Sequence, residues 1–108
     1  MTSYKVAVAS IDGKFVDQHF GKAEHFFTFE VEDNGDHHLI ELRKTAPLCG
    51  GSDELKEKTL DIISDCEVVL VNQIGPGAAR KLINRGVKTL ILYMSIEDAL
   101  KEVSLYQM

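Results

Sequence analysis

The sequence predicts an α/β fold built on a single sheet, with strands in its first half and alternating helices and strands in its second. The first half carries short apolar and aromatic runs separated by turn residues, a pattern typical of strands. The second half carries a nearly continuous apolar run, as in a strand buried on both faces, between stretches with the periodicity of amphipathic helices. With 108 residues, of which 44% are hydrophobic, the chain can bury one core, so we expect residues 1–108 to form a single domain.

Three strands are predicted before residue 45. Lys5–Ser10 is apolar and is followed by the turn signal Asp12-Gly13, and Phe26–Val31 is aromatic and β-branched. Asp33-Asn-Gly35 then predicts a tight hairpin, because Asn and Gly both tolerate positive φ. The return strand, His38–Arg43, alternates imperfectly between polar and apolar side chains. The second and third strands are therefore expected to be antiparallel.

Three helices and two further strands are predicted after residue 51. Each helix begins at an N-terminal signal, namely Ser52 as a cap, Pro76 in a first turn and Ser95 as a cap. Gly86 is expected to end the second helix, since glycine is preferred just past a helix C-terminus. The two strands are Glu67–Val71 and Val87–Tyr93.

The order of these elements predicts how the sheet is assembled. Strands joined through helices are usually parallel with right-handed crossovers, so the simplest sheet has the order 3-2-1-4-5 with only strand 2 antiparallel. A mixed five-stranded sheet of this order with three helices is the ribonuclease H-like topology. Strands 1, 3 and 4 then point the same way, and the segments after them meet at one edge. Ligands of open α/β sheets bind at this carboxyl edge, here at the switch point between strands 1 and 4.

The charge balance narrows the classes of partner. Twelve Lys and Arg against 17 Asp and Glu give a net charge of −5 and an isoelectric point near 5.3, with the basic residues dispersed. A nucleic-acid binder usually presents a basic face, so we expect no nucleic acid. No apolar run approaches the roughly 18 residues of a membrane span, and Met1–Lys5 leads into a strand without a signal-peptide segment. We therefore expect a cytoplasmic protein that binds no membrane.

Three segments should converge at the predicted carboxyl edge. Together they offer an imidazole, a thiol, glycine-rich turns that let backbone amides approach a ligand, a helix N-terminus and basic side chains. The segments are Ser10–Ala23 with His19-Phe20-Gly21, Thr45–Gly51 with Cys49, and Asn72–Gly77 with Arg80 one turn into the helix that follows.

Histidine and cysteine are the candidate metal ligands. His19 offers a nitrogen donor suited to iron and other transition metals. The alternative interpretation is that His19 forms hydrogen bonds within its own loop. Cys49 lies in a loop beside two glycines, where a thiol can bind metal, although an inert free thiol is the simpler reading. Cys66 starts the fourth strand, at the opposite end of the sheet, and is predicted to be a small buried residue. An ordinary iron–sulfur cluster takes about four thiolates, so the two cysteines cannot build one alone.

The Gly75-Pro-Gly77 segment has two readings. The free amides and the dipole of a helix N-terminus favour an anion, with Arg80 facing either the anion or solvent. A tight strand-to-helix turn would explain both glycines without any ligand. A Walker A phosphate loop is excluded, since no Gly-Lys-Ser/Thr follows. The carboxylates of a two-metal nuclease and a nucleophile–base pair are also missing from the sequence, so we expect no enzyme.

Five segments carry a joint pattern: Val6-Ala-Val-Ala-Ser10, Val16–Ala23, Phe26–Val31, Asp65–Leu70 and Ile74–Val87. Together they resemble the dinitrogenase iron–molybdenum cofactor biosynthesis family, which includes NifX-type proteins and the carboxyl-terminal domain of NifB. The resemblance covers nearly the whole chain, and its His-Phe-Gly loop is fairly specific. It implies a ribonuclease H-like fold and a non-catalytic carrier that binds a metal–sulfur cofactor or its precursor during nitrogenase maturation.

The resemblance also implies roles for the residues at the edge. The cargo would be the iron–molybdenum cofactor, an iron–sulfur precursor or another molybdenum-containing cluster, and the partners a cofactor-assembly scaffold or a MinD-type ATPase. Two alternatives stay open: a protein-interaction module that regulates such an ATPase or scaffold without a cofactor, and a small phosphate- or nucleotide-binding domain. His19 and Cys49 would be the metal ligands; Phe20, Gly21, Gly75, Gly77 and Arg80 would complete the binding site; and Lys14, Lys22 and Arg80 would offset the charge of the cluster.

Overall fold

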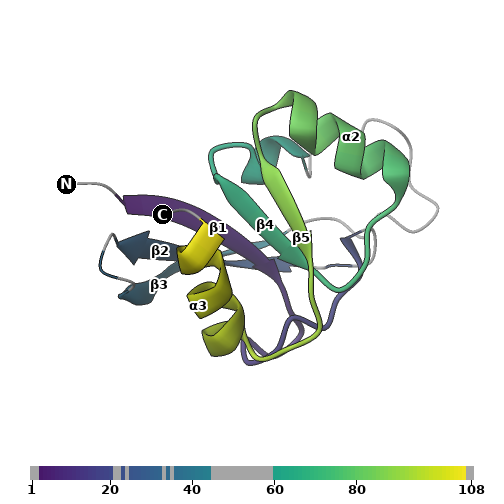
Figure 1. Ribbon diagram of the computed structural model, residues 1–108. Coiled ribbons are helices and arrows are strands. Elements are labelled where there is room, and N and C mark those ends of the chain that lie inside the picture. Colours follow the sequence, from purple (N-terminus) through teal and green to yellow (C-terminus); the bar gives the residue numbers. More distant parts are fainter. Residues whose placement is uncertain are drawn as a thin grey trace.

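The computed structural model describes residues 3–20, 23, 25–32, 34, 36–44 and 60–106. Five strands form one sheet in the order β3-β2-β1-β4-β5, with helices on both of its faces (Figure 1). The predicted α/β fold and strand order are therefore confirmed. The elements are β1 (Ser3–Ala9), β2 (His25–Glu32), β3 (His37–Lys44), β4 (Val68–Val71), α2 (Pro76–Asn84), β5 (Lys88–Ile91) and α3 (Ile96–Tyr106), with a further helical turn at residues 60–63.

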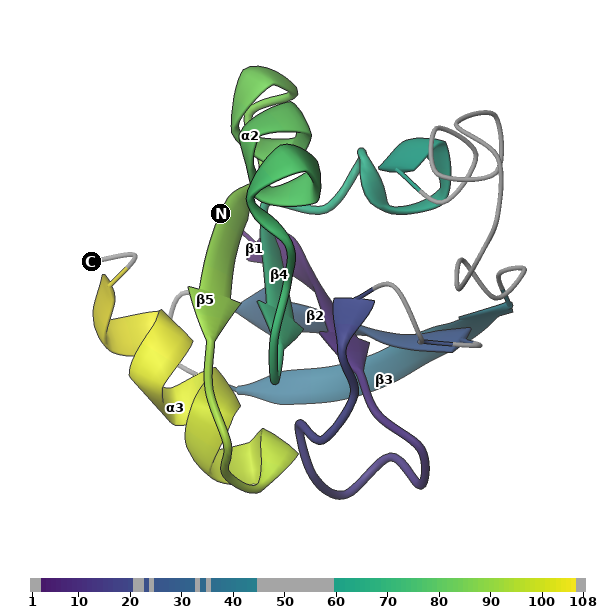
Figure 2. The same cartoon turned by 90° about the vertical axis from the view of Figure 1, so that its right-hand side faces the viewer.

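The directions of the strands also follow the prediction. β2 is antiparallel to both β1 and β3, whereas β4 is parallel to β1 and to β5, and Figure 2 shows β4 and β5 ending at the same edge. A β-bulge opposite Thr28 and Phe29 leaves Ile40 of β3 without a cross-strand partner. This extra residue places Leu39 and Leu42 on the same face of the sheet. The imperfect alternation of β3 in the sequence is the signature of that bulge.

Each face of the sheet carries an apolar core. On the face covered by α2 and the helical turn, the large buried side chains include Phe20, Phe26 and Leu82. On the face covered by α3 they include Leu70 and Leu100. Alternate residues of β4 enter the two cores, and all four of its residues are buried. The prediction of a strand buried on both faces is therefore confirmed.

The helix boundaries follow the signals in the sequence. Pro76 is the first residue of α2, and Gly86 lies just past its end at a φ of +81°, a left-handed conformation that glycine adopts without strain. The Ser95 hydroxyl accepts a hydrogen bond from the Asp98 N–H at 3.2 Å and caps α3. These local signals fix where each helix starts relative to the edge of the sheet.

Two predicted elements differ in their extent. The helix expected from Ser52 is described only at residues 60–63, because residues 45–59 lie outside the described part of the chain. The fifth strand ends at Ile91 rather than Tyr93, because the chain then turns and pairs with the loop after β1.

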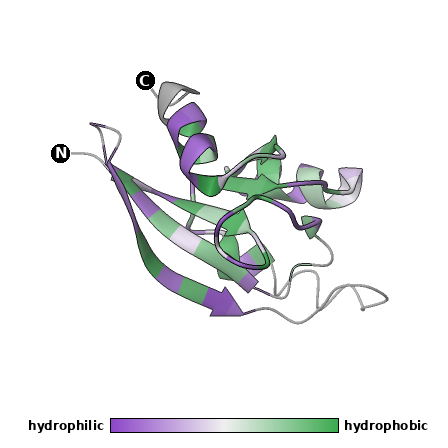
Figure 3. Ribbon diagram, turned by 90° about the horizontal axis from the view of Figure 1, so that it is seen from below, coloured by the Kyte–Doolittle hydropathy of each residue, from purple (hydrophilic) through white to green (hydrophobic). Residues whose placement is uncertain are grey.

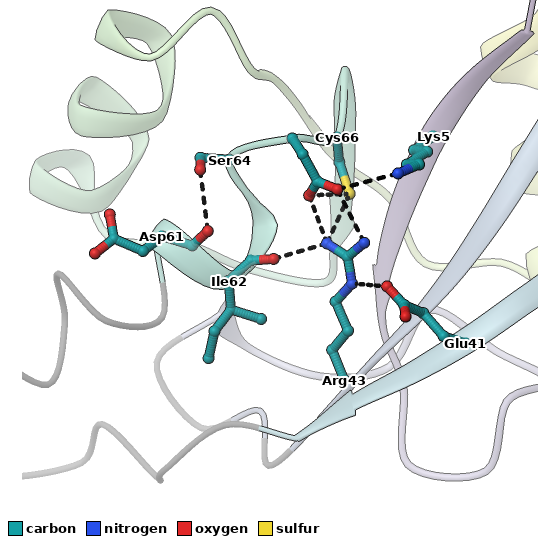
Figure 4. A network of polar contacts seen from close by, with 8 residues as sticks. Lys5, Glu41, Arg43, Asp61, Ile62, Ser64 and Cys66 are labelled. Atoms are coloured by element: carbon teal, nitrogen blue, oxygen red, sulfur yellow. Dashed lines mark hydrogen bonds and ion pairs between the residues drawn. The ribbon is translucent and has the colours of Figure 1, made fainter.

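Arg43 joins the end of β3 to the turn before β4 (Figure 4). Its side chain is 15% exposed, and its Nη1 donates to the Ile62 carbonyl at 2.7 Å. Nη1 and Nη2 donate to the two carboxylate oxygens of Asp65 at 2.5 and 3.0 Å, while Nε donates to Glu41. Hydrogen bonds from Arg43, and then from Lys5 at 3.2 Å, hold the pKa of Asp65 far below its usual range. We call Arg43, Asp65 and the Ile62 carbonyl the Arg43 clip.

The hydropathy of the elements agrees with this layering. β2 and β3 show alternating hydrophilic and hydrophobic bands in Figure 3. Half of the β2 residues are buried, whereas no residue of β3 is buried and its Leu39 and Leu42 are 52% and 47% exposed. Across the described ranges, none of the helices combines the length and the apolar character that crossing a bilayer requires.

Candidate functional site

The loop after β1 returns across the carboxyl edge and inserts between the ends of β1 and β4 (Figure 2). The Gln18 N–H donates to the Ala9 carbonyl at 3.3 Å, and the Gln18 carbonyl accepts a hydrogen bond from the Asn72 N–H, just after β4, at 2.9 Å. The Phe20 N–H donates to the Gln73 carbonyl at 2.8 Å, and His19 and Gln73 are partners in a short parallel bridge. The loop that carries the histidine therefore meets the turn that leads into α2, as predicted.

His19 is half-buried and is held at the surface by its neighbour. The side chain of Phe20 is 2% exposed, with its ring 5.7 Å from the ring of Phe26 between centroids. His19, in contrast, keeps part of its surface exposed. The structure thus leaves His19 partly accessible at the carboxyl edge and encloses the ring of Phe20 in the core.

Short polar contacts hold the first part of the loop. The Ser10 hydroxyl accepts from the Gly13 N–H at 3.0 Å, and a carboxylate oxygen of Asp12 accepts from the Lys14 N–H at 2.9 Å. This hydrogen bond from Lys14 holds the pKa of Asp12 below its usual value. The Asp17 carboxylate accepts from a backbone N–H of the same loop at 3.0 Å. The two aspartates thus accept backbone hydrogen bonds within the loop after β1.

The N-terminus of α2 lacks a described side-chain cap and an acidic residue in its first turn. Gly75 is its N-cap residue, with no side-chain cap hydrogen bond among the described residues, and α2, which is described throughout, has no acidic residue in its first turn. Neither Gly75 nor Gly77 adopts a positive φ, and a Cβ at either position would meet no described atom within 4 Å. The tight-turn reading therefore does not explain these glycines, since the turn demands neither. Arg80, one turn on, is exposed. Within the first turn of α2, an anion would meet backbone amides and no carboxylate.

The remaining predicted residues lie elsewhere or outside the described chain. Gly21, Lys22 and Cys49 fall outside the described residues. Cys66 is buried at the start of β4, at the end of the sheet away from His19, where burial raises the pKa of its thiol to about 11. Its prediction as a small buried residue is confirmed. Among the described residues, no group of three or more His, Cys, Asp or Glu side chains is placed to hold a metal ion.

Two features of this region were missed from the sequence. One is the backbone bridge between His19 and Gln73, for which the only signal was the presence of polar residues directly after a buried strand. The other is a hollow of about 320 Å³ on the α3 face, between Lys14, Phe29 and His37, so that one of the cations predicted to offset the cluster charge lines it.

Comparison with known proteins identifies the family. The dinitrogenase iron-molybdenum cofactor family matches residues 2–105, which is nearly the whole chain. The chain belongs to this family. One relative is the FeMo cofactor biosynthesis protein NifB of Frankia alni, to which the chain is 32% identical over 104 residues. The match covers 91% of this chain and 20% of that protein. It is 29% identical over 89 residues to protein NifX of Azotobacter vinelandii, covering 82% of this chain and 56% of that protein.

Solved structures support the family fold. The crystal structure of PH0822 superposes with a TM-score of 0.70 at 22% identity, covering 94% of this chain and 90% of that one. A putative dinitrogenase from Methanocaldococcus jannaschii gives a TM-score of 0.60 at 15% identity, covering 98% and 89%. The chain spans about a fifth of the NifB relatives and about half of NifX, so it corresponds to one part of those longer proteins.

Proposed function

We propose that this chain binds a metal–sulfur cluster of the iron–molybdenum cofactor type, or its iron–sulfur precursor, and carries it without catalysing a reaction. His19 is the proposed protein ligand, and Cys49, five residues after the end of β3, is the second candidate. The observation that carries the proposal is the backbone bridge between His19 and Gln73, which holds His19, a residue type suited to binding iron, beside the turn into α2. Membership of the dinitrogenase iron-molybdenum cofactor family supports the class of cargo.

The charges around the edge suit an anionic cluster. Such a cluster brings most of its own ligands, so the protein has to supply one or two donors and offset the remaining negative charge. The bare N-terminus of α2 offers amides and the positive end of the helix dipole. Lys14 and Arg80 are exposed cations in the segments that flank His19 and Gly75. A site with few protein ligands also releases its cargo readily, which a carrier requires.

An anaerobic titration of the metal-free protein tests the ligand. The protein is titrated with isolated iron–molybdenum cofactor and, separately, with an iron–sulfur precursor, and binding is followed by visible absorption and by co-elution in gel filtration. We expect saturable binding near one cluster per chain, weakened about tenfold or more in His19→Ala. His38→Ala is the matched control, because His38 pairs with Glu30 of β2 near the start of β3, at the end of the sheet opposite the carboxyl edge.

A second pair of variants tests the role of the α2 N-terminus. Gly77→Asp places a carboxylate in the first turn, and the fold tolerates the new side chain because its Cβ meets no described atom. Aspartate there favours the helix but repels an anionic cluster, so we expect unchanged or higher thermal stability together with cluster binding weakened about tenfold. Gly77→Asn, which has the same shape without the charge, is expected to bind like the wild type. Equal binding by both variants would place the cluster elsewhere.

The titration also separates the alternatives. If His19→Ala binds the cluster as tightly as the wild type, the carrier function stands but His19 is not the ligand, and Cys49→Ser is tested next. Binding of phosphate or a nucleotide at the same stoichiometry, weakened by Gly77→Asp and unaffected by His19→Ala, favours the phosphate-binding alternative. Binding of neither cluster contradicts the carrier and favours an interaction module that acts on an assembly scaffold or a MinD-type ATPase.

A further inference from the structure

An exposed apolar patch borders the candidate site on the β5 side of the carboxyl edge. Phe15, in the loop after β1, is 48% exposed, and Ile91 and Tyr93, at the end of β5 and just beyond it, are 60% and 76% exposed. We call these three residues the aromatic patch. Phe15 precedes His19 by four residues of the same loop, a separation of at most about 13 Å in an extended chain. The patch is therefore close to the site without including it.

Backbone pairing holds the patch in place. The Val16 N–H donates to the Met94 carbonyl at 2.9 Å, and Phe15 and Ser95 are partners in an antiparallel bridge. Opposed residues of such a pair project to the same side, and Tyr93, two positions before Ser95, shares that side. Met94 packs into the core on the α3 face, so its neighbour Tyr93 points outwards. Figure 2 shows the loop beside the segment that leads from β5 to α3. Two aromatic rings are thus presented to solvent on a paired backbone.

The charges around the patch are predominantly negative. The described residues 10–20 and 91–98, which carry the patch, include four carboxylates and one lysine, and two of the carboxylates lie in the first turn of α3. The first turn of α2, fully described, has none. Because both helices follow strands that end at the same edge, an anion is favoured at the start of α2 and disfavoured at the start of α3. The edge therefore divides into a side suited to an anionic cargo and an acidic side that carries the aromatic patch. The charged residues of the acidic side are Asp12, Lys14, Asp17, Glu97 and Asp98.

We propose that the aromatic patch docks the protein that exchanges the cluster with this chain, and that this protein presents an apolar recess bordered by lysine and arginine side chains. The inference rests on the proposed function, because it names the partner of the same site. Exposed aromatic rings at a fixed position are typical anchors of protein interfaces. A second copy of the chain fits poorly, since its own carboxylates would face those of the first copy. A basic rim on the partner pairs with them and speeds association.

Direct binding to a cluster-free cofactor-assembly scaffold protein tests the proposal without any cluster. The scaffold protein is immobilised, and association of the metal-free chain is measured for the wild type, Phe15→Ser and Tyr93→Ser. Ile83→Ser is the matched control, because Ile83 is 66% exposed near the far end of α2. We expect each patch variant to bind about tenfold or more weakly and the control to stay within about twofold. Association of the wild type is expected to slow as salt increases from about 50 to 300 mM.

The outcomes distinguish this proposal from the proposed function. Equal affinities of the patch variants and the wild type, or no association of the wild type, overturn the docking surface. Self-association of the wild type that both patch variants abolish assigns the patch to a second copy and also overturns it. Because no cluster is present, these results are independent of the titration with His19→Ala. In that titration the patch variants are expected to bind cluster as tightly as the wild type.

Discussion

Replacing Arg43 by methionine removes the Arg43 clip while keeping most of the apolar stem of the side chain. The substitution deletes the hydrogen bond to the Ile62 carbonyl at 2.7 Å and both hydrogen bonds to Asp65. It therefore releases the end of β3 from the turn that precedes β4. We expect the fold to persist, because the sheet pairing of β3 with β2 does not involve this side chain.

The size of the effect follows from the exposure of the two partners. A hydrogen bond to a charged group contributes about 1.5–3 kcal/mol when shielded from water, and an exposed ion pair about 0.2–1 kcal/mol. The Arg43 side chain is 15% exposed, but that of Asp65 is 48% exposed, so solvent screens much of the interaction. We expect Arg43→Met to lower the free energy of unfolding by about 1–2 kcal/mol, or the melting temperature by about 5–15 °C.

Urea unfolding followed by far-ultraviolet circular dichroism measures this loss, and Asp65→Asn adds a test by pH. The folded-state pKa of Asp65 is depressed, so its stabilisation is fully present above the unfolded-state value near 4 and is lost as the pH falls through the folded-state value. The difference in unfolding free energy between the wild type and Asp65→Asn should therefore be constant near neutral pH and shrink steadily below about pH 4.

An exposed ion pair on α3 supplies the control. Lys101 and Glu97 lie 3.9 Å apart with both side chains largely exposed, so Lys101→Met should change the unfolding free energy by less than about 0.5 kcal/mol. The reasoning is refuted if Arg43→Met is no more destabilising than this control. It is also refuted if the deficit of Asp65→Asn persists undiminished in acid.

Three further predictions concern glycine conformation, the core and the buried thiol. In urea titrations, Gly13→Ala should lower the unfolding free energy by about 2–3 kcal/mol and Gly86→Ala by about 1 kcal/mol. Both glycines have positive φ, but only a Cβ at Gly13 would lie 2.8 Å from the ring of Phe27. Equal losses in the two variants would refute the steric argument. Phe20→Ala should cost about 3–5 kcal/mol in the same titration, since the ring is fully enclosed; a loss below about 1 kcal/mol would mean that the ring is not a core element. With the other cysteine replaced, Cys66 should react with iodoacetamide at pH 8 at least about a hundredfold more slowly than a free thiol, because its pKa is raised to about 11, and denaturant should abolish the difference.

Most of the fold follows from signals that are local in the sequence. The turn at Asn34, the proline that opens α2, Gly86 and the Ser95 cap each act within a few residues, so their effects can be predicted without knowing the tertiary structure. The bulge at Ile40 was visible as broken alternation, but its position depends on the register with β2 and could not be assigned from one strand. Strand ends shifted by one or two residues because neighbouring segments, rather than propensity, decide where pairing stops.

The candidate site was predicted less completely than the fold. Topology alone brings the loop after β1 and the turn after β4 to one edge, and the structure places His19 beside Gln73 there. The bridge itself uses backbone atoms, which carry no residue-type signature. The Arg43 clip was also unpredictable, because it joins side chains 22 positions apart whose charges look ordinary in the sequence. Both features depend on long-range geometry that composition and periodicity do not encode.

The parallel bridge at His19 has a consequence for how the site can change. Partner residues of parallel strands present their side chains on the same face, so position 73 lies alongside the imidazole. The Gln73 side chain is exposed, and the pairing is made by its backbone, so this position accepts other residues without disturbing the loop. One substitution at position 73, to cysteine or histidine, adds a second donor atom next to the first. Under the proposed function, a single amino-acid change would therefore turn a site with one protein ligand into a site with two.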